Sequence, residues 1–289
     1  MSAGAGLMQQ DRIREERDRI IREDGPWTLH NFRLSENVWT IGEENNPLVN
    51  PYIDGLRRIV QISSDLLGGK LAGARVADLG SGEGGFAVEF ARHGARVTAV
   101  EGREISCRKI LFAKDALSLE TLEVVRGDVR KLGNDDLGSF DIVLCIGLLY
   151  HLDAPDVFDF VKSIHALCTK AAIFDTQLAT VPILSRDYEN RTYYGKEFVE
   201  HTPHETRAAN AADELWSSLD NPRSFWFTAP SLMNLLRDVG FSSVYECRNP
   251  YTKPPRRHSN RVTLVAIKGN PVTILSVPDQ PQIRWPDNI

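Results

Sequence analysis

The stretch Val76-Ala-Asp78-Leu-Gly80-Ser-Gly82-Glu-Gly84-Gly85 decides the fold of this chain of 289 residues. An apolar run ends at Leu79, glycines then alternate with small or polar residues, and a helical pattern begins. Glycine lets the backbone turn tightly and approach a ligand where no side chain fits. The stretch therefore predicts a strand, a ligand-binding turn and a helix, an arrangement that on its own would equally serve a dinucleotide.

On both sides of this turn, short apolar runs alternate with helical patterns. Strands interleaved with helices indicate parallel βαβ units and an α/β fold. The predicted strands cover 76–79, 96–100, 122–125, 141–146 and 171–175, and the predicted helices cover 84–93, 104–117 and 155–168. Further along, the pattern predicts a helix at 229–239 and closing strands at 244–247 and 262–267.

The sequence divides into three predicted parts. Residues 1–70 form an N-terminal helical and aromatic cap. Residues 71–268 form the α/β domain, with an insertion at 179–225 where the rhythm of strands and helices breaks. Residues 269–289 contain several prolines and are interpreted as an extended tail. The helices of the cap are expected at 7–24 and 52–67.

Composition and charge limit the classes of function. Apolar residues make up 42% of the chain, but no apolar run reaches the ~20 residues that cross a bilayer. The net charge of −5 argues against a nucleic-acid partner, because such partners are usually met by a basic surface; the segment 253–258 is a local basic exception. The cysteines lack CxxC spacing and are interpreted as reduced thiols, so we expect a cytoplasmic protein. They are Cys107, Cys145, Cys168 and Cys247.

Three acidic residues distinguish the glycine-rich turn from a dinucleotide site. Asp78 stands two residues before the first glycine, where its carboxylate would face a cationic amino-acid ligand. Glu101 ends the second predicted strand and is suited to a ribose diol. Asp128 follows the third predicted strand and brings another acid to the mouth of the sheet.

These residues resemble the motifs of class I S-adenosylmethionine-dependent methyltransferases. The resemblance is firm over 70–178 and continues over 226–268 as a strand pattern. It implies a Rossmann-like sheet, mostly parallel with an antiparallel closing strand, and S-adenosylmethionine as cofactor. In this family the residues matching Glu101 and Asp128 bind the ribose and the adenine amino group. The implied cofactor-binding residues are Asp78, Gly80, Ser81, Gly82, Glu101, Gly102, Asp128, Val129, Cys145 and Gly147.

The segment after the fourth predicted strand bears on the reaction. It reads Cys145-Ile-Gly147-Leu-Leu-Tyr150-His151-Leu and lacks both the Pro-Pro-Tyr of base-amine methyltransferases and a Pro-Cys pair for attack on a pyrimidine carbon. Tyr150 and His151 are the candidate catalytic residues, because a histidine can take a proton from a hydroxyl as a methyl group moves. The alternative is a histidine that only packs or positions the substrate. We therefore expect O-methylation of a small-molecule hydroxyl or carboxylate, such as a sugar or natural product.

Other interpretations stay open. Segments around Trp27–Gly42, 149–151 and Phe225–Ser231 resemble the tRNA wobble-uridine carboxymethyltransferase family and its small-molecule relatives. A non-catalytic adenosylmethionine-binding protein is a third hypothesis, and a homodimer is compatible with the sequence. A fourth hypothesis is a magnesium ion held by His151, Asp175 and an acid of the insertion. That acid would be Glu197, Glu200 or Glu205. The alternative for Asp175 is that it only caps a helix or stabilises a turn.

The insertion mixes aromatic and polar residues in a way that suits a cover over a cleft. We expect residues 27–46 and 185–210 to become ordered when ligands bind. For Trp216 and Phe225 the favoured interpretation is different, namely packing within the insertion itself.

Overall fold

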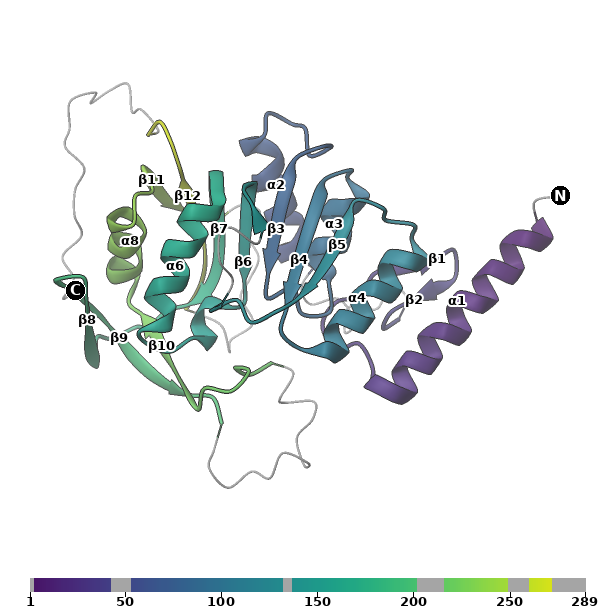
Figure 1. Ribbon diagram of the computed structural model, residues 1–289, viewed down its shortest axis with the longest axis horizontal. Helices are drawn as coiled ribbons and strands as arrows, with labels where there is room; N and C mark the ends of the chain where they lie inside the picture. Colours follow the sequence, from purple (N-terminus) through teal and green to yellow (C-terminus); the bar gives the residue numbers. More distant parts are fainter. Residues whose placement is uncertain (1–2, 43–52, 132–136, 202–215, 249–259, 272–289) are drawn as a thin grey trace. The chain divides into compact units, whose positions relative to one another are not determined.

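The computed structural model describes residues 3–42, 53–131, 137–201, 216–248 and 260–271 (Figure 1). The chain forms two compact units, Met1–Asp128 and Val129–Ile289, each described here by itself. The boundaries predicted from the sequence, at 70/71 and 268/269, stay predictions. Among the described residues, no helix is both long and apolar enough to cross a membrane.

The central sheet has seven strands in the order β11-β12-β7-β6-β3-β4-β5. Strands β3, β4 and β5 pair in parallel, as do β6 and β7, whereas β12 runs antiparallel to both β7 and β11. This confirms the predicted Rossmann-like sheet with an antiparallel closing strand. The strands are β3 Arg75–Leu79, β4 Arg96–Glu101, β5 Leu122–Arg126, β6 Phe140–Ile146, β7 Cys168–Gln177, β11 Ser243–Glu246 and β12 Arg261–Ile267.

In the first unit, β3 and β4 are buried on both faces, which is why their apolar runs are nearly continuous. Helices α3 (Gly85–Arg92) and α4 (Glu104–Ala116) follow these two strands and bury Val88, Phe90 and Ile110. The chain thus makes two successive parallel βαβ units. They bring the residues that follow β3, β4 and β5 to the same edge of the sheet.

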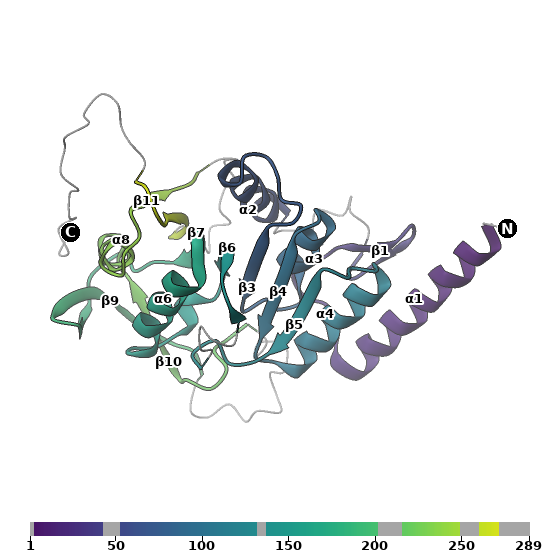
Figure 2. The ribbon, with the colours of Figure 1, turned by 45° about the horizontal axis from the view of Figure 1, so that its top comes forward.

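The N-terminal segment is part of the first unit. Helix α1 (Ala3–Asp24) begins four residues before the prediction and lies beside α4, with Ile13 and Ile20 buried (Figure 2). The aromatic-rich stretch that follows makes a short hairpin of β1 (Arg33–Ser35) and β2 (Val38–Trp39). Helix α2 (Ile53–Leu66) confirms the second predicted helix.

The second unit carries the helices η1 (Leu149–His151), α6 (Asp156–Leu167) and α8 (Ala229–Asp238). Helix α8 begins where the sequence indicates, because the Thr228 side chain accepts a hydrogen bond from the Ser231 backbone N–H and Pro230 lies in the first turn. Helix α6 buries one apolar face, which includes Phe158, Val161 and Ile164.

The insertion forms a small antiparallel sheet in the order β10-β9-β8, which the sequence did not predict. The strands are β8 Leu184–Tyr188, β9 Arg191–Val199 and β10 Arg223–Phe227. Between β8 and β9, Glu189 and Asn190 both adopt positive φ, as a two-residue hairpin turn requires. Phe225 packs against Phe227 of β10 and Phe158 of α6, so it joins the insertion to α6 rather than packing within the insertion alone. Residues 202–215 lie outside the described part.

Candidate active site

The glycine-rich turn after β3 is held against the end of β4. Gly80, Gly82 and Gly84 all have positive φ, a conformation that other residues adopt only with strain. The backbone N–H groups of Gly80 and Ser81 both donate to the Val100 carbonyl, at 2.9 and 3.0 Å. The turn is therefore fixed by the backbone itself, with glycine at three positions where a side chain would be strained.

Glu101 joins this turn to the start of α4. Its side chain is buried, Oε2 accepts the Gly82 N–H at 2.8 Å, and Oε1 accepts the Arg103 N–H at 2.8 Å. Burial raises the pKa of Glu101, and the two backbone hydrogen bonds oppose that shift. A carboxylate offers about four lone-pair sites. Glu101 can hold the turn and still accept hydrogen bonds from two ligand hydroxyls.

Asp78 is a buried acid beneath the same turn. The Ser81 hydroxyl donates to its Oδ2 at 2.6 Å. Burial raises the pKa of Asp78 to about 6, against the hydrogen bonds from Ser81 and the Ala87 backbone, and nearby Glu101 raises it further. A carboxylate that has lost water in this way would be stabilised by a cationic ligand.

The other predicted cofactor residues fall into two groups. In the first unit, Gly102 and Asp128 are partly exposed, and the Gly127 N–H donates to the Glu101 carbonyl at 3.0 Å. This bond joins the loops after β4 and β5. In the second unit, Val129 and Cys145 are buried, and Gly147 follows β6 with φ of 73°.

Glu83, within the glycine-rich turn, has a role that the sequence analysis missed. It accepts the backbone N–H groups of Thr28 and Leu29 at 3.0 and 3.1 Å, and the Lys109 ammonium donates to Oε1 at 2.9 Å. Lys109 also donates to the Pro26 carbonyl at 2.7 Å. Lys109 lies on the buried face of α4. Its position could have indicated this contact, because a buried ammonium group needs a partner.

His30 connects the same N-terminal segment to α3. The Gly85 N–H donates to His30 Nδ1 at 3.1 Å, and burial lowers the pKa of His30, which favours a neutral, accepting ring. A β-carbon at Gly85 would lie only 2.7 Å from the His30 ring. Glycine is therefore required at this position by the close approach of the histidine.

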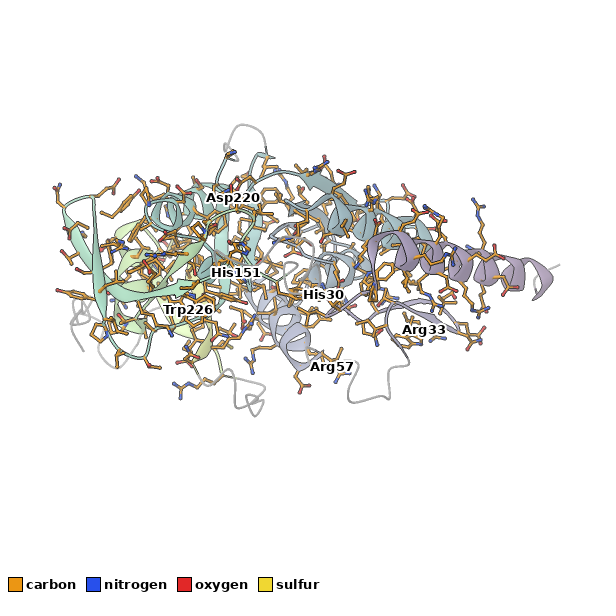
Figure 3. The ribbon with its side chains drawn as sticks, turned by 90° about the horizontal axis from the view of Figure 1, so that it is seen from below. His30, Arg33, Arg57, His151, Asp220 and Trp226 are labelled. Atoms are coloured by element: carbon orange, nitrogen blue, oxygen red, sulfur yellow. The ribbon has the colours of Figure 1, made fainter. Side chains whose placement is uncertain are left out.

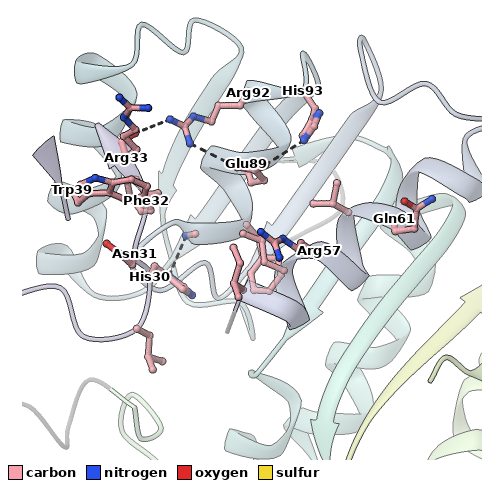
Figure 4. Close-up of a pocket in the computed structure, with 16 residues that line it drawn as sticks. His30, Asn31, Phe32, Arg33, Trp39, Arg57, Gln61, Glu89, Arg92 and His93 are labelled. Carbon is pink, nitrogen blue, oxygen red and sulfur yellow. Dashed lines mark hydrogen bonds and ion pairs between the residues drawn. The ribbon is translucent and has the colours of Figure 1, made fainter. Parts of the chain in front are cut away.

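A hollow of about 620 Å³ lies in the first unit on the outer face of α3, bounded by α2 and the β1–β2 hairpin (Figure 4). Phe32, Trp39 and Phe86 supply aromatic walls. Polar groups at its rim interact with one another, since Glu89 pairs with both Arg92 and His93. The hollow is a feature of the N-terminal segment and α3 rather than of the glycine-rich turn.

In the second unit, His151 ends the short helix η1 and is held by an acid. Its Nδ1 lies 2.9 Å from Oε2 of Glu200, whose side chain is only 1% exposed. The Asn221 side chain donates to the His151 carbonyl at 2.9 Å. Beside it, the Trp226 indole N–H donates to the Tyr150 carbonyl at 2.9 Å, and Figure 3 shows His151 and Trp226. Tyr150 and His151 thus lie together, with their rings 4.3 Å apart.

Of the residues of the magnesium hypothesis, the structure brings His151 and Glu200 together, whereas Asp175 is engaged elsewhere. Asp175 accepts hydrogen bonds from Arg261 Nε and from the Thr263 hydroxyl, the latter at 2.7 Å. It lies inside β7, so the interpretation as a cap or turn residue is wrong. Glu197 pairs with Arg223, and Glu205 lies outside the described residues. In the described part of the chain, no three His, Cys, Asp or Glu residues form a group that could hold a metal ion.

Parts of the chain match known proteins in sequence. Residues 76–171 match the family model described as Methyltransferase domain. A magnesium-protoporphyrin O-methyltransferase of Rhodobacter capsulatus is 41% identical over 87 residues, 30% of this chain and 38% of that protein. A ubiquinone biosynthesis O-methyltransferase of Acinetobacter baylyi is 29% identical over 99 residues, 34% of this chain and 41% of that protein. The chain therefore spans about two fifths of the length of these curated relatives.

A solved structure covers more of the chain. The N-terminal domain of EvdMO1, crystallised with S-adenosylhomocysteine and D-fucose, superposes with a TM-score of 0.66 at 22% identity, covering 89% of this chain and 97% of that one. The strand order, the glycine-rich turn and the acid at the end of β4 define the class I fold of S-adenosylmethionine-dependent methyltransferases. Together with the family match over residues 76–171, they confirm the resemblance over that part of the chain.

Proposed function

We propose that this chain is an S-adenosylmethionine-dependent O-methyltransferase acting on a hydroxyl or carboxylate of a small molecule. The observation that carries the proposal is the glycine-rich turn joined by Glu101 to the loop after β4, above the buried acid Asp78. The O-methyltransferase names of the two curated relatives support the same chemistry.

The first unit would hold the cofactor. Asp78 offers a desolvated carboxylate to the ammonium group, Glu101 offers lone pairs to the ribose hydroxyls, and the turn allows close backbone approach. Asp128 would meet the adenine amino group. When bound, S-adenosylmethionine supplies an electrophilic methyl group: the bond from acceptor oxygen to carbon forms as the carbon–sulfur bond breaks, and the sulfur keeps the electron pair.

The second unit would supply the groups that act on the acceptor. His151 can take the proton of a hydroxyl, and Tyr150 lies against its ring. Positioning of the acceptor contributes as much as proton transfer, because methyl transfer depends on in-line alignment of the two reactants.

The test is methyl transfer by the purified chain. It would be incubated with S-adenosylmethionine and a panel of sugars, phenols and carboxylic acids, and products would be identified by mass. We expect a methylated oxygen product that disappears in the Glu101→Ala variant and persists in Glu104→Gln, which changes an exposed acid of α4. Preferential binding of NADH by calorimetry, or methylation of tRNA alone, would contradict the proposal.

A further inference from the structure

Glu200 follows strand β9, and its side chain is almost completely buried. Besides its contact with His151, Oε1 accepts the Ser224 hydroxyl at 2.7 Å and Oε2 accepts the Ser218 N–H at 3.0 Å. Burial raises the pKa of Glu200, but the hydrogen bonds from His151, Ser224 and Ser218 outweigh it and hold the pKa below its ordinary value. Glu200 is therefore an anion that only accepts hydrogen bonds.

From these contacts we infer that Glu200 is a positioning residue that keeps the His151 proton on Nδ1, so that Nε2 serves as the base, and that the acceptor is consequently a hydroxyl rather than a carboxylate. The inference rests on the proposed methyltransferase function and deepens it. Neither the family match nor the named relatives assign a role to Glu200.

The choice of tautomer follows from the hydrogen bond. A neutral imidazole carries one N–H and one lone pair, and the nitrogen that faces an ionised carboxylate must be the donor. The Nδ1 atom faces Glu200 at 2.9 Å, which leaves the lone pair on Nε2. The acid also stabilises the imidazolium that forms when Nε2 takes a proton, as carboxylates behind histidines do elsewhere.

Both partners are held in place by separate contacts. Asn221 fixes the backbone of His151, while Ser224 on β10 and the Ser218 backbone fix Glu200. The Ser218 hydroxyl in turn contacts His201 at 3.1 Å.

Among the described residues, Asp153 accepts the Ala154 N–H, and three ion pairs lie on the segments next to η1. They are Asp175 with Arg261, Arg223 with Glu197, and Asp220 with Arg130. Strands β7 and β10 are the strands that contact η1 most, and they carry Asp175 and Arg223. In the described part of the chain, Glu200 is thus the acid that contacts the His151 ring.

The class of acceptor follows from the need for a base. With a hydroxyl, the oxygen–hydrogen bond breaks as the oxygen–methyl bond forms, its electron pair stays on oxygen, and the proton moves to Nε2 and later to water. A carboxylate acceptor is already ionised at neutral pH and gives His151 no proton to take. An oriented histidine backed by a buried anion is therefore useful for a hydroxyl and superfluous for a carboxylate.

The decisive variant is Glu200→Gln, which removes the charge and one acceptor but keeps the shape. Its matched control is Glu189→Gln, an exposed acid at the β8–β9 turn that pairs with Lys162. We expect kcat to fall by ~10- to 100-fold in Glu200→Gln, with KM and the Kd for S-adenosylmethionine nearly unchanged, and wild-type values in the control. The acidic limb of the kcat–pH profile should move to lower pH, because the imidazolium loses its anion.

A measurement on the wild-type chain avoids the risk that the variant does not fold. Long-range proton–nitrogen correlation spectra, with His151 assigned among the seven histidines by His151→Asn, report its tautomer directly. The Nδ1–H form supports the inference, and the Nε2–H form overturns it. Equal kcat values and pH profiles in Glu200→Gln and its control would also overturn it.

The acceptor class has its own outcome. A wild-type enzyme that methylates only carboxylic acids in a panel of matched alcohols and acids overturns the hydroxyl assignment while leaving the proposed function intact. A chain that binds S-adenosylmethionine but methylates nothing in either series contradicts the proposed function itself. The two failures are therefore distinguishable.

Discussion

The ammonium of Lys109 lies 2.9 Å from Oε1 of Glu83, with both side chains almost completely buried. The pair joins α4 to the glycine-rich turn, and through the N–H groups of Thr28 and Leu29 it also holds the N-terminal segment. The Lys109 ammonium lies 5.3 Å from the centre of the Trp27 ring as well. One ion pair thus fixes three parts of the first unit that are far apart in sequence.

Removing one partner of this pair should be costly. In Lys109→Met, Glu83 is left buried without its cation, and the free energy of unfolding should fall by about 3–5 kcal/mol. Lys114→Met, at a half-buried position of the same helix, should change it by less than about 1 kcal/mol. Urea denaturation measures both, and hydrogen exchange at Thr28 and Leu29 should accelerate only in the first variant. Equal effects would show that the pair does not hold the segment.

Asp78→Asn should stabilise the chain without cofactor. Because folding raises the pKa of Asp78 to about 6, the folded state binds its proton more tightly, and the stability from this group is lost as pH rises through about 6. Above that pH the buried charge costs about 2–3 kcal/mol, which asparagine removes. Denaturation at pH 5 and pH 8 tests this: the variant should gain stability mainly at pH 8. A gain of the same size at both pH values would refute the assignment.

The affinity for S-adenosylmethionine should depend on pH through the same residue. A cationic ligand favours the ionised form of Asp78, so binding should weaken as pH falls below about 6 and should release a proton there. Calorimetry in buffers of different ionisation enthalpy measures the proton release. Asp78→Asn should lose both affinity and pH dependence, whereas retention of the pH dependence would point to another group.

Glu101→Ala should weaken S-adenosylmethionine binding by about 1–3 kcal/mol, since it removes the ribose acceptor together with the bond to Gly82. Glu104→Gln, three residues further along, is the control and should bind normally. A dissociation constant equal to that of the wild type would show that Glu101 does not contact the ribose.

Chelation of divalent metals should leave turnover unchanged. The carboxylate of Asp175 already accepts hydrogen bonds from Arg261 and Thr263, and Glu200 is bonded to His151. Rates measured with excess EDTA and then with added magnesium should agree within about twofold. Loss of a metal that the reaction requires would lower the rate by much more than this. Activity abolished by EDTA and restored by magnesium would revive the metal hypothesis.

The sequence was sufficient for the central sheet because its strands are short, buried apolar runs with a strong local signal. It failed for the insertion, where strand β9 has two adjacent tyrosines and a glycine in place of a regular alternation and pairs with β10 across more than twenty residues. The contact of Glu83 with Lys109 was missed for the same reason, and that of Glu200 with His151 was considered only as one alternative within the magnesium hypothesis. They join residues that are remote in sequence, and neither propensity nor periodicity encodes which partner a buried charge will meet.

The close approach of His30 to Gly85 constrains how this chain can change over generations. Any side chain at position 85 would clash with the His30 imidazole. A substitution of Gly85 is therefore tolerated only after His30 has been replaced by a smaller residue. Replacing the histidine first removes the acceptor of the Gly85 N–H, which makes the permitted order mildly harmful at its first step. Positions 30 and 85 should therefore change together in related sequences. Such paired substitutions would reveal a coupling between the N-terminal segment and the α/β domain.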